Sequence, residues 1–180
     1  MFLEANINEL FLAARISLQG EKSPGFMGQG FPFSGGLLSR EDRVKLDGTW
    51  DRIDGASVLD KYQFVLIVLG KAQMDKGSAP FQPTAVLIDA RNKLIHYKQG
   101  LYEGGTEQKG FGQLKALLGG SSFLPHPFTS GSNPLYPDQF FGYAGCRWAW
   151  QTADAFAQEF HRQLGIEAAY EKFRPDLKLT

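Results

Sequence analysis

Apolar residues recur at helical spacing in several long segments of this chain, and this periodicity is the feature that most constrains its fold. In the opening segment LEANINELFLAARISL, the apolar residues at this spacing are Leu3, Ile7, Leu10, Phe11, Ala14 and Leu18. Their spacing predicts a helix over residues 2–18. No clear strand pair and no internal repeat accompany these segments. We therefore predict an all-α fold, a four- to five-helix up-and-down bundle with loop-rich insertions.

Signals for helix starts and ends mark two further helices in the first half of the chain. Ser39 and Asp42 resemble a capping box, which predicts a short charged helix that ends near Gly48. Ser57 is placed to cap the start of an apolar core helix, VLDKYQFVLIVLG, which Gly70 ends.

Two more helices are predicted in the second half of the chain. Pro83 suits the first turn of a helix in PTAVLIDARNKLIHYK, whose buried side is expected to hold Val86, Leu87, Ala90, Leu94 and Ile95. A last long helix is predicted from residue 137 to residue 165, with in-register residues Phe141, Ala144, Trp148, Thr152, Ala155 or Phe156, and Phe160.

The whole chain, residues 1–180, is expected to form a single domain, because 180 residues with 43% hydrophobic content suit one core. Segments 20–38 and 98–136 are rich in glycine and are interpreted as loop-rich insertions. Within the second, TEQKGFGQLKALLGG alone has a helical pattern, closed by Gly119. The first helix begins at the initiator methionine with no N-cap residue ahead of it, so we expect the natural chain to have an upstream turn or helix.

The charge balance excludes a broad basic surface, since Lys+Arg and Asp+Glu number 19 each. Any RNA contact must therefore be local. The single cysteine, Cys146, cannot form an internal disulfide, and its aromatic neighbours favour a small buried hydrophobe. FVLIVL is too short to span a bilayer, and Glu4 and Glu9 stand where a signal peptide would be basic and then apolar. We expect a cytoplasmic protein without membrane association.

The segment RNKLIH places an arginine, an asparagine and a histidine on one predicted helix. Steps of three, four and seven residues return to nearly the same azimuth, so Asp89, Asn92 and His96 share a polar stripe. Arg91 lies roughly 140° of rotation from His96, so one isolated helix does not point both side chains at a single atom. Either the arginine side chain curls toward the stripe, or a symmetry-related helix supplies a second Arg/His set, which predicts a dimer. Asp89 and Lys93 are expected on a solvated helix face.

An arginine and a histidine of this kind suit RNA cleavage by the ribose 2'-hydroxyl group. Histidine, with an unperturbed pKa of about 6.5, transfers protons near neutrality, and the guanidinium of Arg91 can hold a phosphate. Asn92 could orient His96 or bind a phosphate oxygen. The reaction needs no metal, and His96, His126 and His161 lie too far apart in sequence to suggest a metal site. No cofactor is predicted.

Four segments in this order resemble the HEPN superfamily of small α-helical bundle proteins: LEANINELF, LDKYQFVL, RNKLIHYK and CRWAWQTADAFAQEF. The resemblance covers most of the chain apart from the glycine-rich segments, and RNKLIH is its most specific part. It implies a metal-independent endoribonuclease that acts on RNA, in single-stranded form, as a homodimer whose two Arg/His motifs line a shared cleft. Many members are toxins, anti-phage effectors or RNA-processing factors, which implies an antitoxin or another protein partner.

The resemblance also implies a role for each matching residue. Arg91 would bind phosphate and stabilise the transition state, His96 would transfer the proton, and Asn92 would be a polar helper. Glu4 and Asn8, one turn apart on the first helix, match polar positions that often face the motif helix. A purely structural role for these two, in tying helices together, remains open.

Less specific interpretations of the motif also remain open. His96 could be a histidine that interacts with the C-terminal dipole of its helix, and Arg91 could form a salt bridge to Glu4, Glu9 or another carboxylate. The alternative function is a non-catalytic HEPN module that binds RNA, a nucleotide or a protein partner. A third is a structural helical dimer in which the motif braces the interface.

Overall fold

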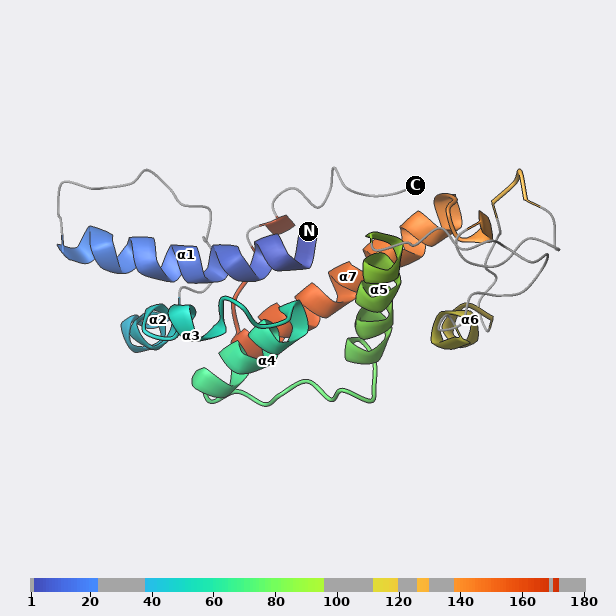
Figure 1. Ribbon diagram of the computed structural model, residues 1–180. Helices are drawn as coiled ribbons and strands as arrows, with labels where there is room; N and C mark the ends of the chain where they lie inside the picture. Colours follow the sequence, from blue (N-terminus) through green and yellow to red (C-terminus); the bar gives the residue numbers. More distant parts are fainter. Residues whose placement is uncertain are drawn as a thin grey trace. The chain divides into compact units, whose positions relative to one another are not determined.

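The chain folds into α-helices, as the computed structural model shows (Figure 1). The structure describes residues 2–22, 38–95, 112–119, 126–129, 138–168 and 170–171. Within these ranges there is no β-strand, so the prediction of an all-α fold is confirmed. The up-and-down order of the helices stays a prediction. None of the helices within the described ranges is long and apolar enough to cross a membrane.

The structure divides into two compact units, which are described separately below. Unit 1 comprises Met1–Met74 and Ala157–Thr180, and unit 2 comprises Asp75–Phe156. The prediction of a single domain therefore stays a prediction. In chain order the helices are α1 (Phe2–Lys22), α2 (Arg40–Asp47), α3 (Trp50–Ile53), α4 (Val58–Val68), α5 (Phe81–Ile95), α6 (Gly112–Gly119) and α7 (Tyr143–Leu164).

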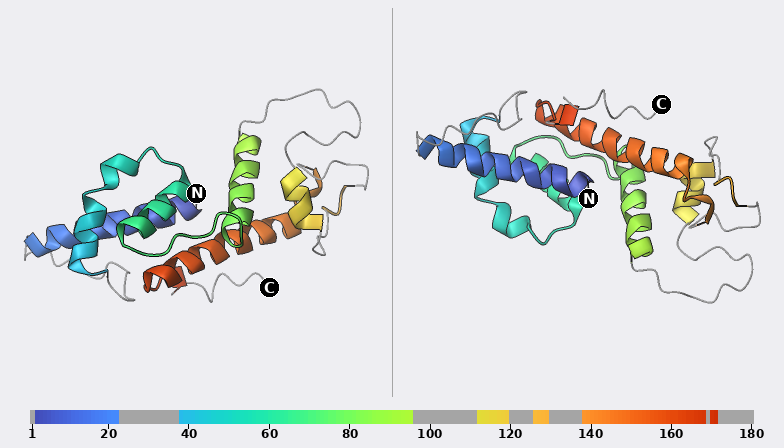
Figure 2. Two further views of the ribbon diagram at one scale, coloured as in Figure 1. Left: turned by 90° about the horizontal axis from the view of Figure 1, so that it is seen from below. Right: turned by 90° about the horizontal axis from the view of Figure 1, so that it is seen from above.

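The core of unit 1 is built on the apolar face of α1. All six apolar residues predicted to share that face are buried: Leu3, Ile7, Leu10, Phe11, Ala14 and Leu18. The helix continues to Lys22 rather than ending near Leu18. It packs against α2 and α4, and α2 crosses it at a steep angle (Figures 1 and 2). The short helix α3 has no counterpart in the sequence prediction.

Two predicted serine caps are present. The Ser39 hydroxyl accepts a hydrogen bond from the backbone N–H of Asp42 at 3.1 Å. Ser57 accepts the corresponding bond from Asp60 at 3.3 Å. Each cap satisfies a backbone donor that the first turn of the helix leaves without an intrahelical partner. The predicted starts of α2 and α4 are therefore confirmed.

Two predicted helix ends are marked by glycines in the left-handed region. Gly70 follows α4 with φ 65°, and Gly165 follows α7 with φ 73°. Residues with a Cβ atom rarely adopt this conformation, so glycine ends both helices with little strain.

Tyr62 connects three helices in the buried core of unit 1. Its ring packs edge-to-face on Phe160 of α7, with ring centroids 4.6 Å apart. Its single hydroxyl proton is shared between two acceptors, the Leu3 carbonyl oxygen at 2.8 Å and Asn6 Oδ1 at 3.2 Å. Burial raises the pKa of this hydroxyl well above its usual value, so it stays a neutral donor that joins α4 to the start of α1.

His161 is a buried titratable group beside this core. Its Nδ1–H donates to the Ala157 carbonyl oxygen at 2.7 Å, and its ring lies edge-to-face against Phe160 and Tyr170. Burial lowers the pKa of His161, and the bond to Ala157 and the charge of Glu171 oppose this effect only in part. The folded protein therefore holds His161 as a neutral group.

We expect the free energy of unfolding to fall as the pH falls below about 6.5, the usual value for an unfolded histidine. The unfolded chain takes up a proton there that folded His161 resists, so the stability present above this pH is lost toward the lower folded pKa. Urea unfolding of the protein and of His161→Gln between pH 8 and pH 5 measures the effect. Titrating carboxylates are the same in the parent protein and in His161→Gln, so the difference between the two reports on His161. If the free energy of unfolding depends on pH identically in both, the prediction is contradicted.

In unit 2, α5 packs against α6. The cluster between them consists of Val86, Ala90, Leu114, Leu118 and Phe140, with Leu117 and Trp148 at its edge. Helix α6 confirms the helical pattern predicted inside segment 98–136, most of which lies outside the described residues, as does most of segment 20–38. The sequence left open whether Ala155 or Phe156 lies on the buried side of the last long helix. In α7 Phe156 is buried and Ala155 is exposed.

The prediction that Cys146 is buried is wrong, since this residue is exposed. Its neighbour Gly145 is buried against the Phe140 backbone, where an added Cβ atom would lie 1.9 Å from the Phe140 carbonyl oxygen. Successive helical residues differ by about 100° in azimuth, so Cys146 points away from this contact.

Two apolar residues also differ from their predicted burial. Ile95 is 56% exposed, because it lies about 140° around the helix from Ala90, which faces the core. Phe141 is 42% exposed. It lies in a bend before α7 begins at Tyr143, so the helical register does not apply to it.

Candidate functional site

Arg91 and Asn92 contact each other on the last turns of α5. The guanidinium Nη1 of Arg91 donates a hydrogen bond to Asn92 Oδ1 at 2.9 Å, and both side chains are exposed. Helical geometry alone separates the two residues by about 100°. The arginine therefore curls toward the polar stripe, which is the first of the two arrangements considered from the sequence.

The earlier turns of α5 anchor the helix that carries this pair in unit 2. Thr84 is fully buried, and its hydroxyl donates to the Pro80 carbonyl oxygen at 2.8 Å near the start of the helix. Phe81 packs edge-to-face on Phe156, with ring centroids 5.9 Å apart. Packing of the helix from its first turn to Ala90 leaves the polar side of its last turns facing solvent.

Asp89 does not neutralise Arg91, because Asp89 is paired with Lys93. Its Oδ2 lies 2.6 Å from Lys93 Nζ in an i,i+4 pair on a largely exposed helix face. This confirms the predicted solvated face. No carboxylate in the described part of unit 2 forms an ion pair with Arg91. The positive charge of Arg91 thus remains available to an external anion.

The other predicted site residues are not brought to this pair by the described structure. His96 lies outside the described residues, directly after the last described residue of α5. Glu4 and Asn8 are on α1 in unit 1, whereas the arginine and asparagine pair is in unit 2. The facing of α1 and the motif helix, and the roles of His96, Glu4 and Asn8, therefore stay predictions.

Metal ligands were predicted to be absent, and no cofactor was predicted. Across the described ranges, no group of three or more His, Cys, Asp or Glu side chains could hold a metal ion. Metal independence of any reaction nevertheless stays a prediction, to be tested with a chelator.

A pocket on unit 1 was not predicted from the sequence. It has a volume of about 400 Å³ and is lined by Ala5, Asn8, Glu9, Phe11, Leu12, Arg15, Asp47 and Trp50. The first six share one side of α1, and their helical spacing is visible in the sequence. Asp47 and Trp50 come from α2 and α3, and no local pattern indicates that these helices meet α1 there.

The fold and this site define an all-helical protein with an exposed arginine held by an asparagine near the end of a packed helix. Comparisons with known protein families, with curated proteins and with solved structures find no match to the chain. Any function must therefore be argued from the chain's own residues.

Proposed function

We propose that this protein is a metal-independent endoribonuclease of the HEPN type that acts on single-stranded RNA as a homodimer. The observation that carries the proposal is the exposed Arg91–Asn92 pair, with His96 four residues after Asn92 in the RNKLIH motif. The alternative, a non-catalytic module that binds RNA, a nucleotide or a protein partner, gives a different result in the experiment below.

Arg91 supplies the anion-binding part of the reaction. Its hydrogen bond to Asn92 uses Nη1, so the other guanidinium nitrogens remain as donors for phosphate oxygens. A planar guanidinium binds phosphate through paired, charge-assisted hydrogen bonds. Because Asn92 holds the side chain on the exposed helix surface, less conformational freedom is lost when phosphate binds. Arg91 would then stabilise the charge that develops on the phosphorus-bound oxygens.

His96 supplies the proton transfer. The ribose 2'-oxygen forms a bond to phosphorus, its proton passes to the imidazole, and the bond from phosphorus to the 5'-oxygen breaks. The 5'-oxygen takes up a proton and leaves as a hydroxyl group. The products are a 2',3'-cyclic phosphate and a 5'-hydroxyl end, and no step requires a metal ion or an external oxidant or reductant.

The homodimer is proposed on the family resemblance, which implies that two Arg/His motifs line a shared cleft. The hydrogen bond from Arg91 to Asn92 turns the arginine toward the stripe that His96 is predicted to share, so the geometry of one motif does not by itself require a second copy. Glu4 and Asn8 are proposed as supporting residues, and an antitoxin or another protein as a partner, on the resemblance alone.

Incubation of the protein with single-stranded RNA in excess chelator tests the proposal. We expect strand cleavage that added Mg²⁺ does not accelerate, with 2',3'-cyclic phosphate and 5'-hydroxyl ends on the fragments. Saturable RNA binding without cleavage would instead support the non-catalytic module. If the protein neither cleaves nor binds RNA, both proposed functions are contradicted.

A further inference from the structure

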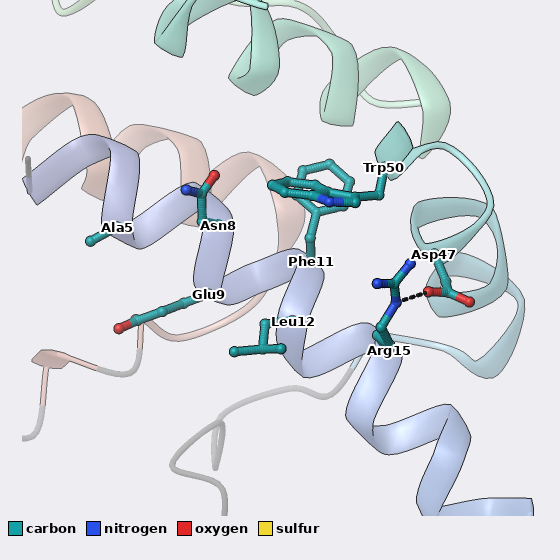
Figure 3. Close-up of a pocket in the computed structure, with 8 residues that line it drawn as sticks. All are labelled: Ala5, Asn8, Glu9, Phe11, Leu12, Arg15, Asp47 and Trp50. Atoms are coloured by element: carbon teal, nitrogen blue, oxygen red, sulfur yellow. Dashed lines mark hydrogen bonds and ion pairs between the residues drawn. The ribbon is translucent and has the colours of Figure 1, made fainter. Parts of the chain in front are cut away.

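The pocket in unit 1 combines one side of α1 with the short helix α3 (Figure 3). Its residues on α1 lie at spacings of three and four, which return to one side of a helix. Trp50 extends over this side from α3, and the ion pair between Arg15 and Asp47 lies at one end. A volume of about 400 Å³ is within the range of small-ligand sites.

The apolar part of the pocket has an aromatic wall. The ring centroids of Phe11 and Trp50 lie 4.9 Å apart with an angle of 52° between the ring planes, and Leu12, which also lines the pocket, is 51% exposed. Lys61 Nζ already lies over the indole of Trp50, 5.3 Å from the ring centroid. The indole thus accepts a cation on its π system within unit 1, and the remaining apolar surface suits an aliphatic stem.

The polar part of the pocket consists of hydrogen-bond acceptors. Asn8 Oδ1 is buried and accepts no hydrogen bond from any described residue. The Glu9 carboxylate is exposed and forms no ion pair within the described ranges. Arg15 Nε binds Asp47 Oδ1 at 2.8 Å, so these two charges neutralise each other. What remains for a ligand is the negative charge of Glu9, because the buried Asn8 Oδ1 has no surface that a ligand could reach.

We propose that this pocket binds an organic cation with an N–H donor head and an apolar stem, of the alkylguanidinium or alkylammonium class. The head would bind the Glu9 carboxylate, and the stem would pack on Leu12, Phe11 and Trp50. An anion is disfavoured because the free charge of the pocket is negative. A neutral ligand would leave Glu9 without a counter-ion. This binding does not depend on the proposed RNA cleavage, since Glu9, Leu12, Phe11 and Trp50 have no proposed part in it.

NMR titration of the whole protein tests the proposal with two probes of similar shape, n-butylguanidinium and the neutral n-butylurea. We expect saturable shifts of the Trp50 indole N–H signal with the cation, and at least about threefold weaker binding of the urea, as for a partly exposed charge pair. A capped arginine amide provides a third arm. If this amide binds more tightly than butylguanidinium, the natural ligand is an arginine side chain of a peptide. If it binds more weakly, the natural ligand is a free amine or guanidine.

Matched variants locate the binding. Glu9→Gln should weaken butylguanidinium at least about threefold and leave butylurea nearly unchanged. Glu167→Gln, which removes an exposed carboxylate of the same unit outside the pocket, should change neither. The proposal is overturned if butylguanidinium gives no saturable shift, if the urea binds equally well, or if Glu9→Gln keeps full affinity.

Discussion

Replacing Arg91 with alanine is expected to lower the rate of RNA cleavage at least about a hundredfold, the usual cost of losing one donor to a developing oxyanion. The guanidinium is exposed, is positioned by Asn92 and is paired with no carboxylate in the described part of its unit. Its loss removes charge from the site while the buried side of α5 stays intact. Arg91→Lys should recover only part of the rate, because an ammonium group cannot bind two phosphate oxygens as a planar fork. Single-turnover cleavage of a labelled single-stranded RNA measures both variants.

Lys93→Ala is the matched control for Arg91→Ala. Lys93 is also a basic residue on α5, but it is paired with Asp89 at 2.6 Å. Its removal should change the cleavage rate only slightly, and the helix content of all three variants should equal that of the parent protein. If both alanine variants lose activity equally, general charge rather than a specific phosphate contact explains RNA binding. If Arg91→Ala keeps full activity, the assignment of Arg91 is wrong.

Replacing Phe160 with alanine is expected to lower the free energy of unfolding by about 3–5 kcal/mol. Phe160 is fully buried and packs edge-to-face on Tyr62, the residue that joins α4 to the start of α1. The substitution removes the aromatic ring and leaves a cavity at this junction. Because small domains are stable by only about 5–15 kcal/mol, this variant should unfold at much lower urea concentration. Urea unfolding followed by far-ultraviolet circular dichroism measures the difference.

Phe128→Ala makes the same chemical change at a residue that is 92% exposed. Its effect on the free energy of unfolding should stay within about 0.5 kcal/mol. An equal loss of stability in the two variants would show that the Phe160 contact with Tyr62 is not what stabilises unit 1.

The all-α class followed from local signals that the folded chain keeps. The six apolar positions of α1 are buried together, and the serine caps and left-handed glycines stand at the predicted helix boundaries. These features depend on helical periodicity and on the conformation of one or two residues. The predicted burial of Cys146 and Ile95 was wrong for a different reason. Their exposure depends on which neighbouring element covers each side of a helix, and periodicity does not identify that element.

The candidate site was predictable to a similar extent. The sequence identified Arg91 and Asn92 as neighbours on one helix, and the structure adds the 2.9 Å hydrogen bond between their side chains. The convergence of Arg91 and His96 stays a prediction. The pocket of unit 1 was missed, because Asp47 and Trp50 join α1 only through tertiary packing. Its unpartnered Asn8 Oδ1 likewise becomes visible only once the surroundings of that side chain are known.

Cleavage of single-stranded RNA by His96→Ala in excess chelator tests the proposed mechanism most directly. Circular dichroism and size-exclusion chromatography first establish that the variant keeps the fold and the oligomeric state of the parent protein. The proposed proton transfer predicts that the parent cleaves RNA in chelator and that the variant is slower by at least about a hundredfold. Equal cleavage by the two proteins would contradict it.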